Sequence, residues 1–166
     1  MVNKFIVIIA GIVAVMAALI AIPGIGSEQN VPEEDLNIEY SRQNLTLLED
    51  GRFYATSVDD LVIRNDRSAT YRNLTGGSDT KQFSISREDL AGLKRLIFET
   101  GFMHLPGDDY SERNDLDEVT RYRLTLTSGE NSKTVTWVNL EASEEAVPSL
   151  VRNIGAQLDE IIARNT

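Results

Sequence analysis

The N-terminal segment from Phe5 to Ile25, FIVIIAGIVAVMAALIAIPGI, contains no charged residue. A helix of about 20 residues covers roughly 30 Å, which matches the thickness of the hydrocarbon core of a bilayer. Lys4 lies on the short N-terminal side, which favours an N-terminus inside the cell and a domain outside the cytoplasm. The segment therefore predicts a transmembrane helix within residues 1–26 that acts as an uncleaved signal-anchor in the cell membrane.

Cleavage is the competing interpretation of the same segment. Gly24 and Gly26 place small residues at the third-last and last positions before Ser27, and Pro23 ends the apolar helix just upstream. A peptidase that cuts after Gly26 would release the protein as a secreted form. The apolar stretch is longer than the usual signal core of about 7 to 15 residues, so the uncleaved anchor is favoured.

Composition limits what the remaining chain can do. An acidic tether of residues 27–35 and one domain of residues 36–166 are expected outside the cytoplasm in either interpretation. The formal net charge of −10 repels phosphate backbones, so no nucleic-acid partner is expected. The chain has no cysteine and one histidine, which excludes disulfides and the usual His/Cys metal sites. The sequence predicts a domain stabilised by packing alone, without a cofactor.

Alternating apolar and polar residues predict several strands. Leu36, Ile38 and Tyr40 alternate in one short strand, and the segment LTLLEDGRFYA contains an Asp50-Gly51 turn that favours a tight hairpin. A second hairpin is predicted over residues 59–74, followed by a strand in KQFSI. A third and longer hairpin is predicted in VTRYRLTLTSGENSKTVTWVN, with the single tryptophan on its buried face.

Two helices complete the expected domain. Ser86 followed three residues later by Asp89 resembles a capping box, and helical spacing of apolar residues then predicts a helix over residues 87–100. A second helix is predicted from Val147 or Pro148 to the end of the chain. The predicted fold class is α+β: an N-terminal transmembrane helix followed by a two-layer domain in which an antiparallel sheet packs against two helices.

No catalytic motif stands out in this domain. His104 lies between Met103 and Leu105, a setting more typical of a packed or surface residue than of a general base. An acidic loop after Pro106 offers oxygen ligands that suit calcium, but it lacks the spacing of a calcium-binding loop. We therefore expect no enzymatic activity and no bound metal; calcium binding by the acidic loop is the alternative. The acidic residues of that loop are Asp108, Asp109, Glu112, Asp115, Asp117 and Glu118.

The same acidic loop is the candidate partner-binding site. The segment from Gly107 to Glu118 is too polar to be core, yet it contains Tyr110, an aromatic residue of the kind that anchors interfaces. Long loops often carry function, and an acidic loop suits a basic or metal-centred partner surface. The hypothesis is that Asp108, Asp109 and Tyr110 contact a protein partner.

Two short sequons mark candidate modification sites. Asn44-Leu45-Thr46 and Asn73-Leu74-Thr75 both have the N-x-T pattern of N-glycosylation acceptors. An exported domain would expose such sites to glycosylation. The pattern is short enough to arise by chance, so Asn44 and Asn73 are candidates only by sequence.

Three segments together resemble a known family. They are FSISREDLAGLKRLIFETGFMHLP, RYRLTLTSGENSKTVTWVN and VPSLVRNIGAQLDEII. The pattern is similar to that of small prokaryotic domains related to emfourin, a protein inhibitor of the thermolysin-like metallopeptidase protealysin. The likeness covers about residues 36–162, and most of its motif positions are core and capping residues. The resemblance implies an α+β fold and a protein partner, with an extracellular metallopeptidase as the candidate.

These observations lead to one favoured function and one rival. The favoured function is a non-enzymatic, membrane-anchored extracytoplasmic binding domain, with a role like that of a peptidase inhibitor. The rival is a secreted enzyme or solute-binding domain whose site is built from scattered carboxylates. A deep pocket with converging polar groups would favour the rival, whereas a shallow exposed surface would favour the binding domain.

Overall fold

The computed structural model describes residues 34–75, 79–113 and 116–166. By its contacts the chain divides into two units, residues 1–30 and residues 31–166, and the second unit contains every described element. The predicted transmembrane segment, the cleavage point after Gly26 and most of the acidic tether lie outside the described residues. Within the described ranges, no helix is both long enough and apolar enough to cross a membrane.

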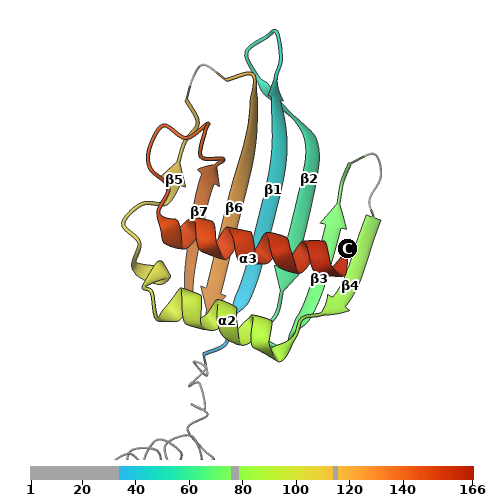
Figure 1. The fold of residues 1–166 in the computed structure, drawn as a ribbon, viewed down its shortest axis with the longest axis vertical. Coiled ribbons are helices and arrows are strands. Elements are labelled where there is room, and N and C mark those ends of the chain that lie inside the picture. Colours follow the sequence, from blue (N-terminus) through green and yellow to red (C-terminus); the bar gives the residue numbers. More distant parts are fainter. Residues whose placement is uncertain (1–33, 76–78, 114–115) are drawn as a thin grey trace, which may run out of the picture. The chain divides into compact units, whose positions relative to one another are not determined.

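A seven-stranded sheet forms one layer of the domain, in the order β4-β3-β2-β1-β6-β7-β5 (Figure 1). Neighbouring strands are antiparallel, except that β5 runs parallel to β7. The prediction of a wholly antiparallel sheet is therefore wrong at this one edge. The strands are β1 (Asn37–Leu47), β2 (Phe53–Ile63), β3 (Ser68–Asn73), β4 (Asp79–Ser84), β5 (Asp109–Tyr110), β6 (Glu118–Ser128) and β7 (Asn131–Val138).

The first hairpin contains a longer strand than the sequence predicted. The two short apolar patterns on either side of Ser41 belong to the single strand β1, which pairs with β2 along almost its whole length. A register shift between Asn44 and Leu45 marks a bulge in this pairing. Gly51, in the predicted turn, has a φ of 81°, which glycine adopts without strain. The long strands of this hairpin form the centre of the sheet.

Two helices form the second layer on one face of the sheet (Figure 1). The helix α2 (Arg87–Phe98) begins at the predicted cap, where the Ser86 side chain accepts a hydrogen bond from the backbone N–H of Asp89. It ends two residues before the predicted end and is followed by the 3-10 turn η1 (Phe102–His104). The helix α3 (Ser149–Asn165) begins directly after Pro148.

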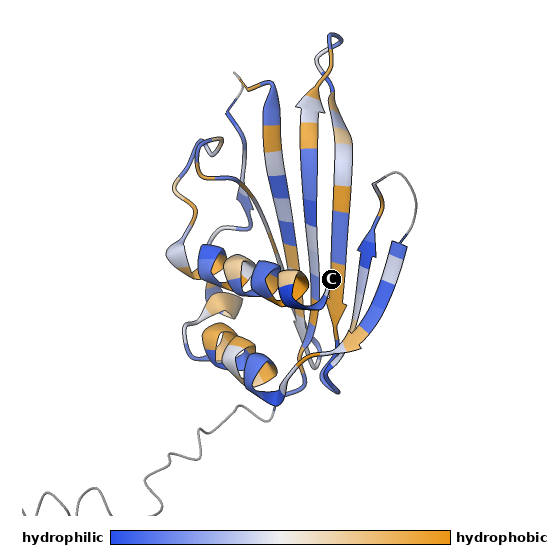
Figure 2. Cartoon of the chain, turned by 45° about the vertical axis from the view of Figure 1, so that its right-hand side comes forward, coloured by the Kyte–Doolittle hydropathy of each residue, from blue (hydrophilic) through white to orange (hydrophobic). Residues whose placement is uncertain are grey.

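The hydrophobic core lies between the helices and the sheet. Its centre is formed by side chains with 0% exposure from both layers, among them Ile38, Leu61, Leu124, Ile154 and Leu158. Figure 2 shows apolar and polar bands alternating along the strands, as expected for a sheet that buries one face. The structure confirms a mixed α+β fold with one sheet and two helices.

On the helix side of the sheet, hydrogen bonds to the buried carboxylate of Asp59 form a network that joins three strands. Asp59 of β2 is 6% exposed and accepts hydrogen bonds from the guanidinium of Arg42 at 2.7 Å, the hydroxyl of Tyr71 at 2.6 Å and the amide of Asn73 at 2.7 Å. Burial alone would raise the pKa of Asp59, but these hydrogen bonds outweigh it and hold the pKa below its usual range. The carboxylate is therefore ionised and fully paired, and it joins β1, β2 and β3.

Candidate functional site

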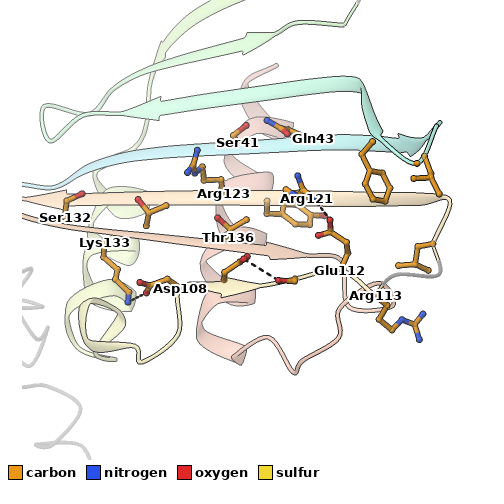
Figure 3. A pocket seen from close by; sticks show the side chains of 18 residues that line it. Ser41, Gln43, Asp108, Glu112, Arg113, Arg121, Arg123, Ser132, Lys133 and Thr136 are labelled. Atoms are coloured by element: carbon orange, nitrogen blue, oxygen red, sulfur yellow. Dashed lines mark hydrogen bonds and ion pairs between the residues drawn. The ribbon is translucent and has the colours of Figure 1, made fainter. Parts of the chain in front are cut away.

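The face of the sheet that the helices leave open contains a long groove of about 1130 Å³ (Figure 3). Its floor is made by β1, β6 and β7, and β5 with the segment after it forms one side. The tip of the β1–β2 hairpin, including Phe53, closes the far end. We name this surface the open-face groove.

Strand register aligns polar side chains across the open face in a single row. Residues paired across neighbouring strands point to the same face of a sheet. The pairings run from β3 through β2, β1, β6 and β7 to β5, so this face presents one polar residue from each strand. The row consists of Arg72, Asp60, Ser41, Arg123, Thr136 and Asp109.

Two ion pairs occupy the side of the groove. Arg121 of β6 pairs with Glu112, and Lys133 of β7 pairs with Asp108 while donating a hydrogen bond to the carbonyl of Leu105 at 2.8 Å. Figure 3 shows these two pairs reaching from the floor toward the β5 side. Both cations are partly withdrawn from solvent, with 35% and 15% side-chain exposure respectively. These pairs position the wall of the groove against its floor.

Two charged residues of the row, Arg123 and Asp109, are exposed and are not held in ion pairs with described residues. Arg123 is exposed, and its side chain makes no hydrogen bond or ion pair with any described residue. Asp109 is exposed and accepts only a long hydrogen bond of 3.3 Å from the hydroxyl of Ser111. Neighbouring strands are about 4.8 Å apart, so the backbones at Arg123 and Asp109 lie about 10 Å apart. Among the described residues of the row, Arg123 and Asp109 thus remain available to a ligand in the groove.

The wall of the groove includes Ser111, Glu112, Arg113 and Leu116, which follow β5 in the chain. Its backbone is held by hydrogen bonds from the N–H of Arg113 to the carbonyl of Ala142 at 2.9 Å and from the N–H of Glu144 to the carbonyl of Ser111 at 3.0 Å. Behind it a second small apolar cluster is buried on the open face of the sheet. That cluster contains Leu45, Val119, Val138 and Ala142, with Leu116, Phe53 and Ala55 packed against it.

The structure separates the three predicted partner-binding residues. Asp108 and Asp109 are exposed and line the open-face groove. Tyr110 is only 8% exposed and belongs to the main core, with its ring against Gly107. The segment is also not a structureless loop, because Asp109 and Tyr110 form β5. The expectation that Tyr110 offers an exposed aromatic anchor is wrong, and the reason is that its strand turns it toward the helices.

The remaining chemical candidates are His104 and the acidic residues considered as calcium ligands. His104 is exposed on η1. Among the described residues no group of three or more His, Cys, Asp or Glu side chains is arranged to hold a metal ion. Of the acidic residues considered for calcium, Asp108 and Glu112 are in ion pairs with basic residues, and Asp115 lies outside the described residues.

Both sequon asparagines have engaged side chains. Asn44 is exposed in β1, where its amide nitrogen donates to the hydroxyl of Ser57 at 2.7 Å and its oxygen accepts from Thr120 at 3.0 Å. Asn73 donates to Asp59 with the nitrogen to which a glycan would be attached. A glycan at Asn73 would therefore be attached directly beside the buried carboxylate of Asp59.

The sequence of β6 contains a signal for the polar face of the groove. In RYRLTLTS the apolar residues Leu124 and Leu126 alternate with polar ones, and this alternation places Arg121, Arg123 and Thr125 on the face opposite the two leucines. Which residues lie beside them depends on strand order and register, and these are not visible in a single sequence.

By its fold and its groove this chain is an α+β domain with a polar, charged surface on an open sheet face. Comparison of the sequence with models of known protein families gives no match, and comparison with curated proteins gives no significant match.

Proposed function

We propose that this protein is a non-enzymatic binding domain, held at the outer side of the cell membrane by its N-terminal segment, and that its open-face groove receives a protein partner. The observation that carries the proposal is the polar row, in which Arg123 and Asp109 are exposed and available about 10 Å apart. A partner surface with a carboxylate and a basic group at that spacing would satisfy both.

The size of the groove supports a macromolecular partner over a small solute. Pockets for small molecules are typically about 300 to 1000 Å³ and enclose most of the ligand. The open-face groove is larger, about 1130 Å³, and runs along an uncovered sheet face. Two carboxylates of the groove wall, Asp108 and Glu112, are in ion pairs with Lys133 and Arg121, which favours a role in holding the wall over a role in acid–base chemistry.

The resemblance to emfourin-related domains supports an extracellular metallopeptidase as the first partner to test. The uncharged run from Phe5 to Ile25, with Lys4 before it, supports the membrane location. An anchored domain with this groove would capture a peptidase or another exported protein close to the membrane surface.

One experiment on intact cells tests both parts of the proposal. A photo-crosslinking amino acid replaces Ser132, an exposed residue of the groove, and in a matched control it replaces Arg87, an exposed residue of α2. After irradiation, membranes are extracted with alkaline carbonate and the chain is detected by immunoblot. We expect the chain in the membrane pellet, with a cross-linked band from position 132 and none from position 87.

Two outcomes contradict the proposal separately. A soluble mature chain that begins at Ser27 would show that the N-terminal segment is a cleaved signal rather than an anchor. Cross-linked bands of equal strength from positions 132 and 87 would show that the open-face groove is not the binding surface. Mass spectrometry of the cross-linked band identifies the partner.

A further inference from the structure

A second cleft lies on the helix side of the sheet, away from the open-face groove. It has a volume of about 440 Å³ and lies between α3 and the strands β1, β6 and β7. Its aromatic floor contains Tyr122 and Trp137, whose rings stack at 5.2 Å with an interplanar angle of 11°. The ring of Tyr40 lies 6.3 Å from each of these two rings, so the three aromatic side chains form one cluster. Residues from three strands thus assemble an aromatic surface that no short segment of the sequence contains.

The wall of this cleft is one face of α3. Arg152, Gly155, Ala156 and Asp159 all line the cleft, and their spacing of three, four and seven residues places them on one side of a helix. The two charged residues are two turns apart, about 10 Å along the axis. Only the small residues Gly155 and Ala156 lie between them on this face, so the space between the charges stays open. The wall therefore has a cationic end and an anionic end.

A residue larger than glycine at position 155 would collide with the aromatic floor of the cleft. A Cβ atom at position 155 would lie 2.9 Å from the indole of Trp137, which is closer than van der Waals contact allows. The indole therefore packs directly on the helix backbone. This contact places the single tryptophan of the chain in the lining of the cleft.

One carboxylate oxygen of Asp159 accepts no hydrogen bond from a described side chain. Its Oδ1 accepts hydrogen bonds from the hydroxyl of Tyr40 at 3.0 Å and from Nη1 of Arg42 at 3.3 Å, whereas no described side chain donates to Oδ2. Burial raises the pKa of Asp159, and the charge of Arg42 and the hydroxyl of Tyr40 oppose this only in part. A further cationic donor at Oδ2 would stabilise this partly buried charge.

At the other end of the wall, Arg152 is exposed, and its side chain makes no hydrogen bond or ion pair with any described residue. A guanidinium group presents a planar fork of donors that matches a carboxylate. We infer that the cleft binds a short zwitterionic ligand, an amino acid or small peptide, with its ammonium group at Asp159 and its carboxylate at Arg152. The face of Tyr122 beside the ammonium group adds a cation–π contact.

Intrinsic fluorescence tests this assignment directly, because the full chain contains one tryptophan and it lines the cleft. The full-length protein in detergent is titrated with glycine, diglycine and triglycine, whose charge separation grows by about 3.5 Å per residue. n-Butylamine and butyrate serve as ligands with one charge only. We expect a saturable change with one member of the peptide series and at least tenfold weaker binding of both single-charge ligands.

Variants assign the two ends of the ligand. Asp159→Asn and Arg152→Gln are each expected to weaken binding of the best peptide at least tenfold, whereas Glu160→Gln, at an exposed position of the same helix, leaves it unchanged. If circular dichroism shows that Asp159→Asn disturbs the fold, Arg152→Gln carries the test, because the side chain of Arg152 makes no hydrogen bond or ion pair with a described residue. Binding of n-butylamine as tight as the best peptide would overturn the assignment. Absence of saturable binding by fluorescence and by calorimetry would overturn it as well.

Discussion

Replacement of Asp59 with alanine is expected to lower the free energy of unfolding by about 1 to 3 kcal/mol, because it leaves the buried hydroxyl of Tyr71 without its acceptor and removes one of the two carboxylates paired with Arg42. Arg42, Tyr71 and Asn73 all donate to this carboxylate, and the side chain of Asp59 is 8% exposed. Denaturant unfolding followed by circular dichroism measures the effect. Asp60→Ala is the matched control, because Asp60 is the next residue on the open face and makes only a 3.3 Å ion pair with Arg72.

The control is expected to cost less than about 1 kcal/mol, as exposed ion pairs do. An Asp59→Ala variant as stable as Asp60→Ala would contradict the structural role of the buried network.

The pH dependence of the stability that Asp59 contributes has a defined sign. Because the pKa of Asp59 is lowered in the folded state, its contribution is present above the unfolded pKa of about 3.9 and is lost as the pH falls through the folded pKa. The difference between wild type and Asp59→Ala should therefore shrink below about pH 4.

Replacement of Ile154 with alanine is expected to lower the free energy of unfolding by about 2 to 5 kcal/mol, through lost burial and the cavity that remains. Ile154 is 0% exposed and belongs to the core between α3 and the sheet. Leu74→Ala is the matched control, because Leu74 is 47% exposed and its truncation should change stability by no more than about 0.5 kcal/mol. Equal midpoints of urea unfolding for the two variants would show that α3 does not stabilise the domain.

The helices were predictable because their signals are local. The Ser86 cap and the apolar spacing that follows it lie within a few residues, and α2 begins where they predict. The same holds for α3, whose buried residues Val151, Ile154, Leu158 and Ile161 repeat at helical spacing. Hairpins with strong turns, such as the one at Gly51, were predictable for the same reason.

Strand order and the β5 edge could not be predicted, because they depend on contacts between distant segments. β5 contains two residues, too few for any alternation, and its parallel pairing with β7 joins residues about 27 positions apart. The acidic residues around Tyr110 indicated a solvated loop, whereas the pairing of Tyr110 with Trp137 directs its ring into the core. Composition of a segment does not reveal which face a single side chain occupies.

In both candidate sites, residues that are distant in the sequence meet only in the folded sheet. Arg123 and Asp109 become neighbours in the polar row only through β7, and the aromatic floor of the second cleft combines strands β1, β6 and β7. The sequence shows that these residues exist and, for Arg123, which face it occupies. Their assembly into sites is a consequence of register, which a single sequence leaves open.

The affinity of an Arg123→Glu variant for the protein partner tests most directly whether the open-face groove is the binding surface. The dissociation constant for the partner identified by cross-linking is measured by surface plasmon resonance with the full-length protein. Because reversal places a like charge opposite the partner's carboxylate, we expect at least tenfold weaker binding, about 1.4 kcal/mol. Arg87→Glu, the charge-matched change on α2, should leave the affinity unchanged. Equal affinities of Arg123→Glu and the wild-type protein would contradict the claim.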